Sequence, residues 1–220
     1  MINKDYILRL IEQFAKVLAK ILKLIMNQQH PEALKTIDQT FQHLFGFNSK
    51  FINSISDDDL IEMMKSGEAL DADKCIMIAL LLKAEGDVYD AQSNLDESYD
   101  RYLRSLLLLL EAFSADSDAN LSTHYSEIGT IINKLQDEEL PDEIKSKLLR
   151  YYEKVGQYSK AEDLLFELIE TNSFDQDILE EGIHFYERLI VKSDSELIAG
   201  NLPRDEVHEG LSGLEKLRRE

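Results

Sequence analysis

Proline, glycine and cysteine are scarce in this sequence, whose 220 residues include 3 Pro, 9 Gly and 1 Cys. Turns and sheets use proline and glycine often, so their scarcity favours helices joined by short connections. The single cysteine, Cys75, cannot form an intramolecular disulfide and lies in the apolar run CIMIALLL. The apolar run predicts that the thiol is buried and structural. The absence of an intramolecular disulfide fits a protein in a reducing compartment, which we expect to be the cytoplasm.

Long hydrophobic runs are also missing. No run approaches the roughly 18 apolar residues that a membrane-spanning helix needs. The segment DYILRLIEQFAKVLAKILKLI, near the N-terminus, interrupts its apolar residues with charge and offers no small-residue cleavage site, unlike a secretory signal. The sequence therefore predicts a chain without a membrane span.

Positive charge is in deficit, with 24 basic against 43 acidic residues and a formal net charge of -19. Such a field repels phosphate backbones, so we expect no nucleic-acid partner. The deficit is uneven, because residues 1–55 carry seven basic and four acidic residues. The first quarter of the chain is thus weakly basic and the remainder strongly acidic.

The sequence lacks the common catalytic motifs. Neither a glycine-rich phosphate loop nor a Gly-x-Ser-x-Gly nucleophile elbow occurs. Cys75 has little positive charge nearby to activate its thiol. These absences favour a protein that is not an enzyme, and we expect no cofactor.

What is present is helical periodicity along the whole chain. Apolar residues in 6–26 recur at the i, i+3, i+4, i+7 spacing of one broad helical face. Pro31 is predicted to open a second helix that Gly46 ends, and Ser56 or Asp57 to cap a third. Further helices are expected at about 71–92, 95–113, up to 136, 142–155, 158–171, 175–192 and from Pro203, with a linker at 114–122 and no strands.

The stretch YYEKVGQYSKAEDLLFELIE, residues 151–170, predicts a tight helical hairpin. Gly156 ends the first helix at little cost because it lacks a Cβ atom. Ala161 then lies on the face shared with Leu165 and Leu168, where its small side chain lets two antiparallel helices approach closely.

This hairpin resembles the tetratricopeptide repeat (TPR), a helix-turn-helix unit of roughly 34 residues. Leu148 and Tyr152 match the apolar anchors of its first helix, whereas Lys145 and Leu149 replace its usual Trp and Gly. Two further hairpins match the repeat pattern more weakly, one containing Gly86 and Tyr102 and the other containing Gly182 and Phe185. The resemblance implies an all-α fold in which antiparallel hairpins at 71–220 stack as a TPR-like solenoid, preceded by an N-terminal helical segment at 1–70.

The full chain is also similar to a family of uncharacterised, mostly Gram-positive bacterial proteins. The similar segments are DYILRLIEQF, INSISDDDL and EGIHFYERLI followed by LPRDEV. This similarity implies a cytoplasmic bacterial protein and assigns no activity.

Basic residues gather at 145–160, in an otherwise acidic half of the chain. The first helix of a TPR hairpin lines the concave groove, where cations can hold a ligand carboxylate by charge-assisted hydrogen bonds. The alternative is that these cations only pair with neighbouring acids, each pair contributing about 0.3–0.5 kcal/mol. The groove candidates are Lys147, Arg150, Tyr151, Lys154, His184 and Arg188.

A non-enzymatic scaffold that binds an unknown protein or peptide segment is therefore the leading hypothesis. The alternative is a helical metal-dependent enzyme, or a ligand- or peptide-sensing regulator. Its metal would be held by two i, i+3 pairs, Glu181 with His184 and Asp205 with His208. Isolated pairs of this kind are expected by chance among 43 acids and 5 histidines, so solvated surface pairs are the simpler interpretation.

The N-terminal helix allows three interpretations. Its apolar face suits packing against the core or a seam between two copies of the chain. Its basic stripe, formed by Arg9, Lys16 and Lys23, would also suit contact with an anionic membrane surface. Core packing or a homodimer is favoured, because Asp5 and Glu12 dilute the positive charge.

Overall fold

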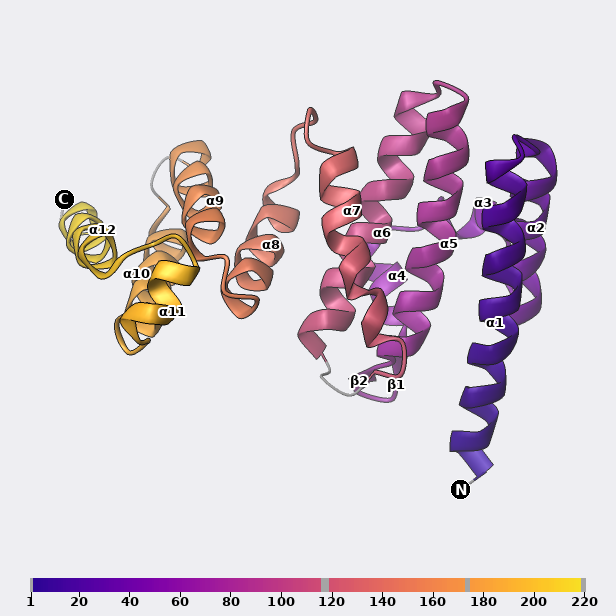
Figure 1. Ribbon diagram of the computed structural model, residues 1–220, viewed down its shortest axis with the longest axis horizontal. Helices are drawn as coiled ribbons and strands as arrows, with labels where there is room; N and C mark the ends of the chain where they lie inside the picture. The colour runs from indigo at the N-terminus through magenta and orange to yellow at the C-terminus, as the bar shows by residue number, and fades with distance from the viewer. Residues whose placement is uncertain (1, 116–118, 173–174, 219–220) are drawn as a thin grey trace. The chain divides into compact units, whose positions relative to one another are not determined.

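The computed structural model is mostly α-helical, which confirms the all-α part of the predicted fold class (Figure 1). It describes residues 2–115, 119–172 and 175–218, the first six of these by backbone alone. The chain divides into two compact units, residues 1–139 and residues 140–220. The sequence-based boundary at residue 70 falls inside the first unit, where α2 packs on α5.

Unit 1 is built around the hairpin of α5 and α6, which lie side by side and antiparallel in Figure 1. Helices α1 and α2 pair with each other and pack on α5, and α7 covers α6. The elements are α1 (Ile2–Met26), α2 (His30–Phe45), α3 (Ser49–Ile52), α4 (Asp57–Met63), β1 (Lys65–Ser66), β2 (Ala69–Leu70), α5 (Ala72–Ala91), α6 (Leu95–Ala115), the 3-10 helix η1 (Ser122–Ser126) and α7 (Glu127–Lys134).

Local signals set several of the helix ends in unit 1. Gly46 ends α2 in the left-handed conformation, with φ of 82°, and its amide donates to the Gln42 carbonyl. The Ser56 side chain accepts a hydrogen bond from the Asp59 amide, and so caps α4 as predicted. Three residues of the predicted linker, 116–118, lie outside the described residues.

The core of unit 1 lies along α5 and α6. Helix α5 is buried on nearly every side, because α1, α2 and α6 surround it. Cys75 is fully buried there, as the sequence predicts. Burial raises the pKa of its thiol to about 12, so the thiol stays protonated at neutral pH.

The prediction of no strands was wrong in one place. A two-stranded antiparallel hairpin pairs Lys65 with Leu70 and Ser66 with Ala69. Gly67, with φ of 70°, makes the turn between the strands. Strands of two residues carry too few positions to show the alternation by which a strand is predicted.

Unit 2 consists of two packed helix pairs: α8 (Asp142–Lys154) with α9 (Tyr158–Thr171), and α10 (Gln176–Ile190) with α12 (Arg204–Leu217). Helix α11 (Asp194–Ala199), which the sequence did not predict, is a short helix fixed by a capping box between Ser193 and Glu196. Gly156, with φ of 75°, ends the turn after α8 as predicted.

Small residues let the helices of unit 2 approach closely. Ala161 is fully buried, as the predicted hairpin requires. A Cβ atom at Gly182 would lie 2.6 Å from a Leu214 methyl and 3.0 Å from one of Leu165. Gly182 therefore lets α10 pack closely against both α9 and α12.

Candidate functional site

The predicted groove residues lie on one face of unit 2, formed by α8 and α10. Helix α8 carries Lys147, Arg150, Tyr151 and Lys154 at i, i+3, i+4 and i+7, so they share one side of the helix. Helix α10 carries His184 and Arg188, with Glu181 one turn earlier. We call this surface the α8–α10 face.

Ion pairs between α8 and α10 connect the residues of this face. The Arg188 guanidinium donates to both Glu153 carboxylate oxygens, at 2.7 and 2.8 Å, a bidentate geometry that orients α10 against α8. Glu181 lies between the two arginines, 3.3 Å from Arg188 and 4.0 Å from Arg150. The fold thus brings Arg150 and Arg188 together around a shared carboxylate.

The remaining groove candidates are placed differently. Lys147 lies 3.4 Å from Glu143, one turn earlier on its own helix. His184 and Lys154 are exposed, and Tyr151 is half-buried beside the core residue Tyr152. The local pairing with acids that the sequence offered as an alternative is therefore present at Lys147, while Arg150 is 65% exposed and only loosely paired.

Two other members of the basic stretch at 145–160 do not belong to this face. Lys145 is 3% exposed, and its ammonium lies 2.6 Å from Glu167 on α9, inside the hairpin. The Lys160 ammonium lies 5.3 Å from the centre of the Tyr152 ring, at the distance of a cation–π contact. Both cations thus contact residues of the α8–α9 hairpin itself.

The alternative metal site has no support in the geometry. Among the described residues, no three His, Cys, Asp or Glu side chains are grouped as metal ligands. Glu181 instead pairs with two arginines, whose charge repels a metal cation. Asp205 and His208 are exposed on α12.

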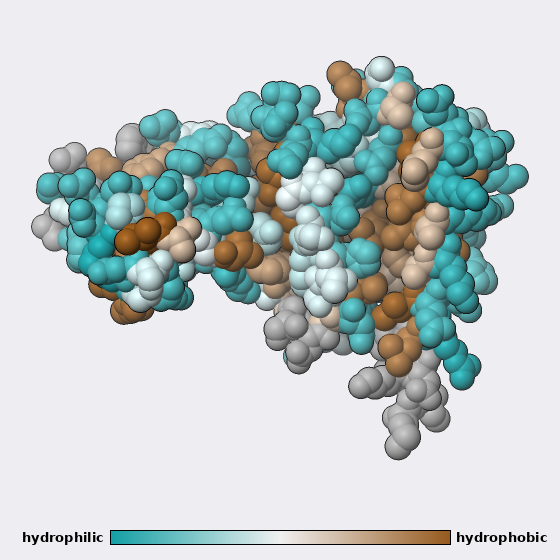
Figure 2. Space-filling view, in the orientation of Figure 1, coloured by the Kyte–Doolittle hydropathy of each residue, from teal (hydrophilic) through white to brown (hydrophobic). Residues whose placement is uncertain are grey.

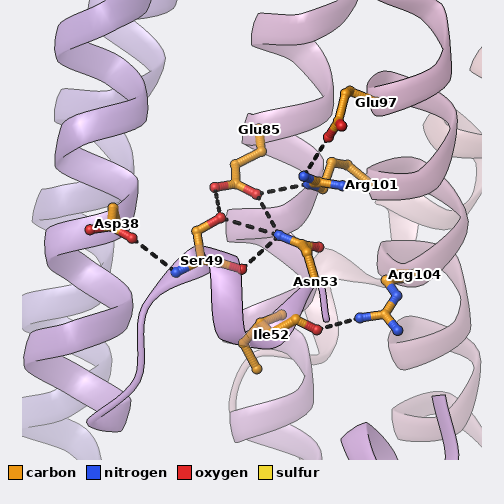
Figure 3. Close-up of polar contacts among 8 residues, drawn as sticks. All are labelled: Asp38, Ser49, Ile52, Asn53, Glu85, Glu97, Arg101 and Arg104. Carbon is orange, nitrogen blue, oxygen red and sulfur yellow. Dashed lines mark hydrogen bonds and ion pairs between the residues drawn. The ribbon is translucent and has the colours of Figure 1, made fainter. Parts of the chain in front are cut away.

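A second polar cluster lies in unit 1, and sequence reasoning missed it (Figure 3). Its centre is Glu85 of α5, which is only 2% exposed. The Glu85 carboxylate accepts hydrogen bonds from the Ser49 hydroxyl, from the Asn53 amide at 3.3 Å, and from the Arg101 guanidinium at 3.1 Å. Burial raises the pKa of Glu85, against the opposing effects of these three partners.

This cluster fastens the segment between α2 and α4 onto the α5–α6 hairpin. While the Ser49 hydroxyl donates to Glu85, the Ser49 backbone amide donates to the Asp38 carboxylate of α2 at 2.9 Å. Arg104 of α6 donates to the carbonyl oxygen of Ile52, the last residue of α3 (Figure 3). It also donates to the carbonyl oxygen of Ile55, three residues further on. These bonds join α2, α5 and α6 to the short segment 49–55, which includes α3, and so fix the backbone of that segment.

A signal for Glu85 does exist in the sequence. The residue stands seven after Ile78, four after Leu81 and three before Val88, so it lies on the buried face of its helix. A carboxylate on such a face requires a cationic partner. The sequence does not say that Arg101, sixteen residues away, supplies it.

The structure thus defines an all-α protein with a cross-helix charged face and a buried polar clamp. The chain belongs to a family of unknown function, DUF6483, whose model matches residues 1–219. No curated protein and no solved structure matches it significantly. No described helix is long and apolar enough to cross a membrane.

Proposed function

We propose that this protein is a non-enzymatic scaffold that binds a protein or peptide segment on the α8–α10 face. Unit 2 would act as a TPR-like pair of hairpins, with α8 and α10 as the first helices that line the groove. The observation that carries the proposal is Arg150, an exposed guanidinium 4.0 Å from its nearest carboxylate oxygen, on a face that Arg188 and Glu153 hold in place.

Charge indicates the class of ligand. The face carries four cations, Lys147, Arg150, Lys154 and Arg188, against Glu143, Glu153 and Glu181, in a chain of net charge -19. An acidic side chain or a peptide carboxyl terminus could displace Glu181 from Arg150 and gain a bidentate contact. Tyr151 would add half-buried aromatic area beside it.

The test compares peptide binding by three forms of the full chain. An array of acidic peptides would be probed with the wild type, with K147A/R150A/K154A, and with K35A/K192A/K216A, which removes the same charge elsewhere. We expect the wild type and the control to bind the same peptides, more weakly at higher salt, and the first variant to lose them. Equal binding by both variants would show that this face is not the groove.

Metal analysis of protein purified without a histidine tag tests the competing enzyme hypothesis. Stoichiometric metal would favour the enzyme and count against the scaffold. This measurement is independent of the peptide array, so the two hypotheses can fail separately.

We further propose that the chain forms a homodimer through α1. Leu8 and Leu22 are each 42% exposed and Met26 is 84% exposed, and Ala15 lies exposed between them. Leu8, Ala15 and Leu22 are spaced by seven, the repeat of a helix-pairing seam, and hydrophobic residues gather in a band along α1 in Figure 2. A two-fold pairing would bury this stripe in both copies.

Sedimentation measures this directly. The wild type and a control, L95D, should sediment as dimers, because Leu95 is exposed at the start of α6, away from the stripe. L22D should sediment as a monomer. A monomeric wild type would contradict the dimer and leave the peptide-binding proposal intact.

A further inference from the structure

A cleft of about 410 Å³ lies between α1 and α2, on a different side of α1 from the exposed stripe. Both helices contribute residues at the spacing of one helical face. The volume falls within the range of small-molecule sites, about 300–1,000 Å³. The lining residues are Gln13, Lys16, Val17, Lys20, Thr36, Gln39, Thr40, His43 and Leu44.

The charge of this lining is opposite to that of the chain. Among the lining residues are two lysines and a histidine, and there is no carboxylate, although acids outnumber bases 43 to 24 in the sequence. Neither Lys16 nor Lys20 forms an ion pair with another described residue, whereas Lys83 and Lys134 in the same unit both do. Lys16 and Lys20 are also spaced i, i+4, where like charges repel each other. Two adjacent cations without an anion favour an anionic ligand.

Part of the cleft lining is apolar. Val17 and Leu44 are half-buried on its two walls. Thr40 is 5% exposed and its hydroxyl donates to the Thr36 carbonyl at 2.6 Å, so its donor is already used within the helix. The threonine methyl groups and the lysine stems add further apolar surface. An inorganic anion alone would leave this surface unused.

We propose that the cleft binds a small amphiphilic carboxylate, a medium-chain acyl anion. Its carboxylate would lie between the Lys16 and Lys20 ammonium groups, and its hydrocarbon chain against Val17 and Leu44. Charge-assisted hydrogen bonds fix the head, and burial of the chain supplies the hydrophobic part of the binding free energy. The cleft belongs to unit 1 and is independent of the α8–α10 face, so this ligand adds a second binding function to the proposed scaffold.

Isothermal titration of the full chain with decanoate, below the concentration at which it forms micelles, tests the proposal. We expect one site per chain, with decanol binding about tenfold or more weakly because it lacks the charge. K16Q/K20Q should weaken decanoate binding about tenfold or more and leave decanol unchanged. The control K23Q/K35Q removes two cations from the same helices outside the cleft, and should bind decanoate as the wild type does.

V17F separates the cleft from the surface charge. A phenyl ring at this position would occupy the apolar wall, so both decanoate and decanol should be lost, while circular dichroism confirms an unchanged helix content. Decanoate binding that survives either V17F or K16Q/K20Q would overturn the proposal. It would also be overturned if the protein bound anionic phospholipid vesicles but not free decanoate, since the basic side of α1 would then be a membrane contact.

Discussion

Replacing Glu85 in two ways tests the account of the buried clamp. E85A removes the acceptor shared by Ser49, Asn53 and Arg101, and leaves the Arg101 side chain, 11% exposed, without its buried partner. Breaking a buried ion pair costs about 3–5 kcal/mol when the remaining charge has no other partner. Arg101 keeps Glu97 at 2.6 Å, so we expect a loss at the lower end of this range, about 3 kcal/mol. For a protein of this size such a loss lowers the melting temperature by about 10 °C.

E85Q should cost much less. Burial raises the pKa of Glu85, which means that the folded protein disfavours the charged carboxylate despite Arg101. A glutamine keeps the shape and an acceptor oxygen for Ser49 and carries no charge to bury, although it gives up the charge that faces Arg101. We therefore expect E85Q to destabilise the protein clearly less than E85A does at neutral pH.

The pH dependence has a definite sign. Because the pKa of Glu85 is higher in the folded than in the unfolded chain, the folded state holds more protons between those two values. Lowering the pH through that window should therefore stabilise the wild type relative to E85Q. Calorimetric unfolding of the three proteins at several pH values measures this difference. E85Q as unstable as E85A at neutral pH, or a difference that does not change with pH, would refute the reasoning.

Two further predictions concern packing. G210A should destabilise unit 2 by about 1–3 kcal/mol, because the added Cβ would overlap the buried Tyr186 ring. In G213A, on the same helix, the added Cβ would meet no atom within 4 Å, so this variant should be neutral or stabilising by up to about 1 kcal/mol. Chemical denaturation of both variants checks the contrast, and equal effects would contradict it. Cys75, with its thiol pKa raised to about 12 by burial, should react with iodoacetamide at neutral pH only after unfolding. Rapid labelling of the native protein would show that the thiol is accessible.

The predicted function and its groove remain proposals, but several local predictions can be judged residue by residue. Ser56 caps α4, Gly46 and Gly156 end turns with positive φ, and Tyr152 is the buried member of its tyrosine pair. Each of these features depends on residues within about one helical turn, so the sequence displays it directly. Helix α11 was missed because six residues show no periodicity, although its capping box was visible in the sequence.

The sequence by itself determined the all-α class, most helix boundaries and the burial of Cys75, because hydrophobic spacing and capping are local. The tertiary structure alone decided which charges meet. Three ion pairs show this: Lys145 with Glu167, Arg188 with Glu153, and Arg101 with Glu85. These partners lie 16 to 35 residues apart, and only the packing of one helix on another brings them within reach. The same holds for α1: the sequence shows the spacing of its cations along the helix, but only the packing of α1 on α2 shows that Lys16 and Lys20 line a cleft.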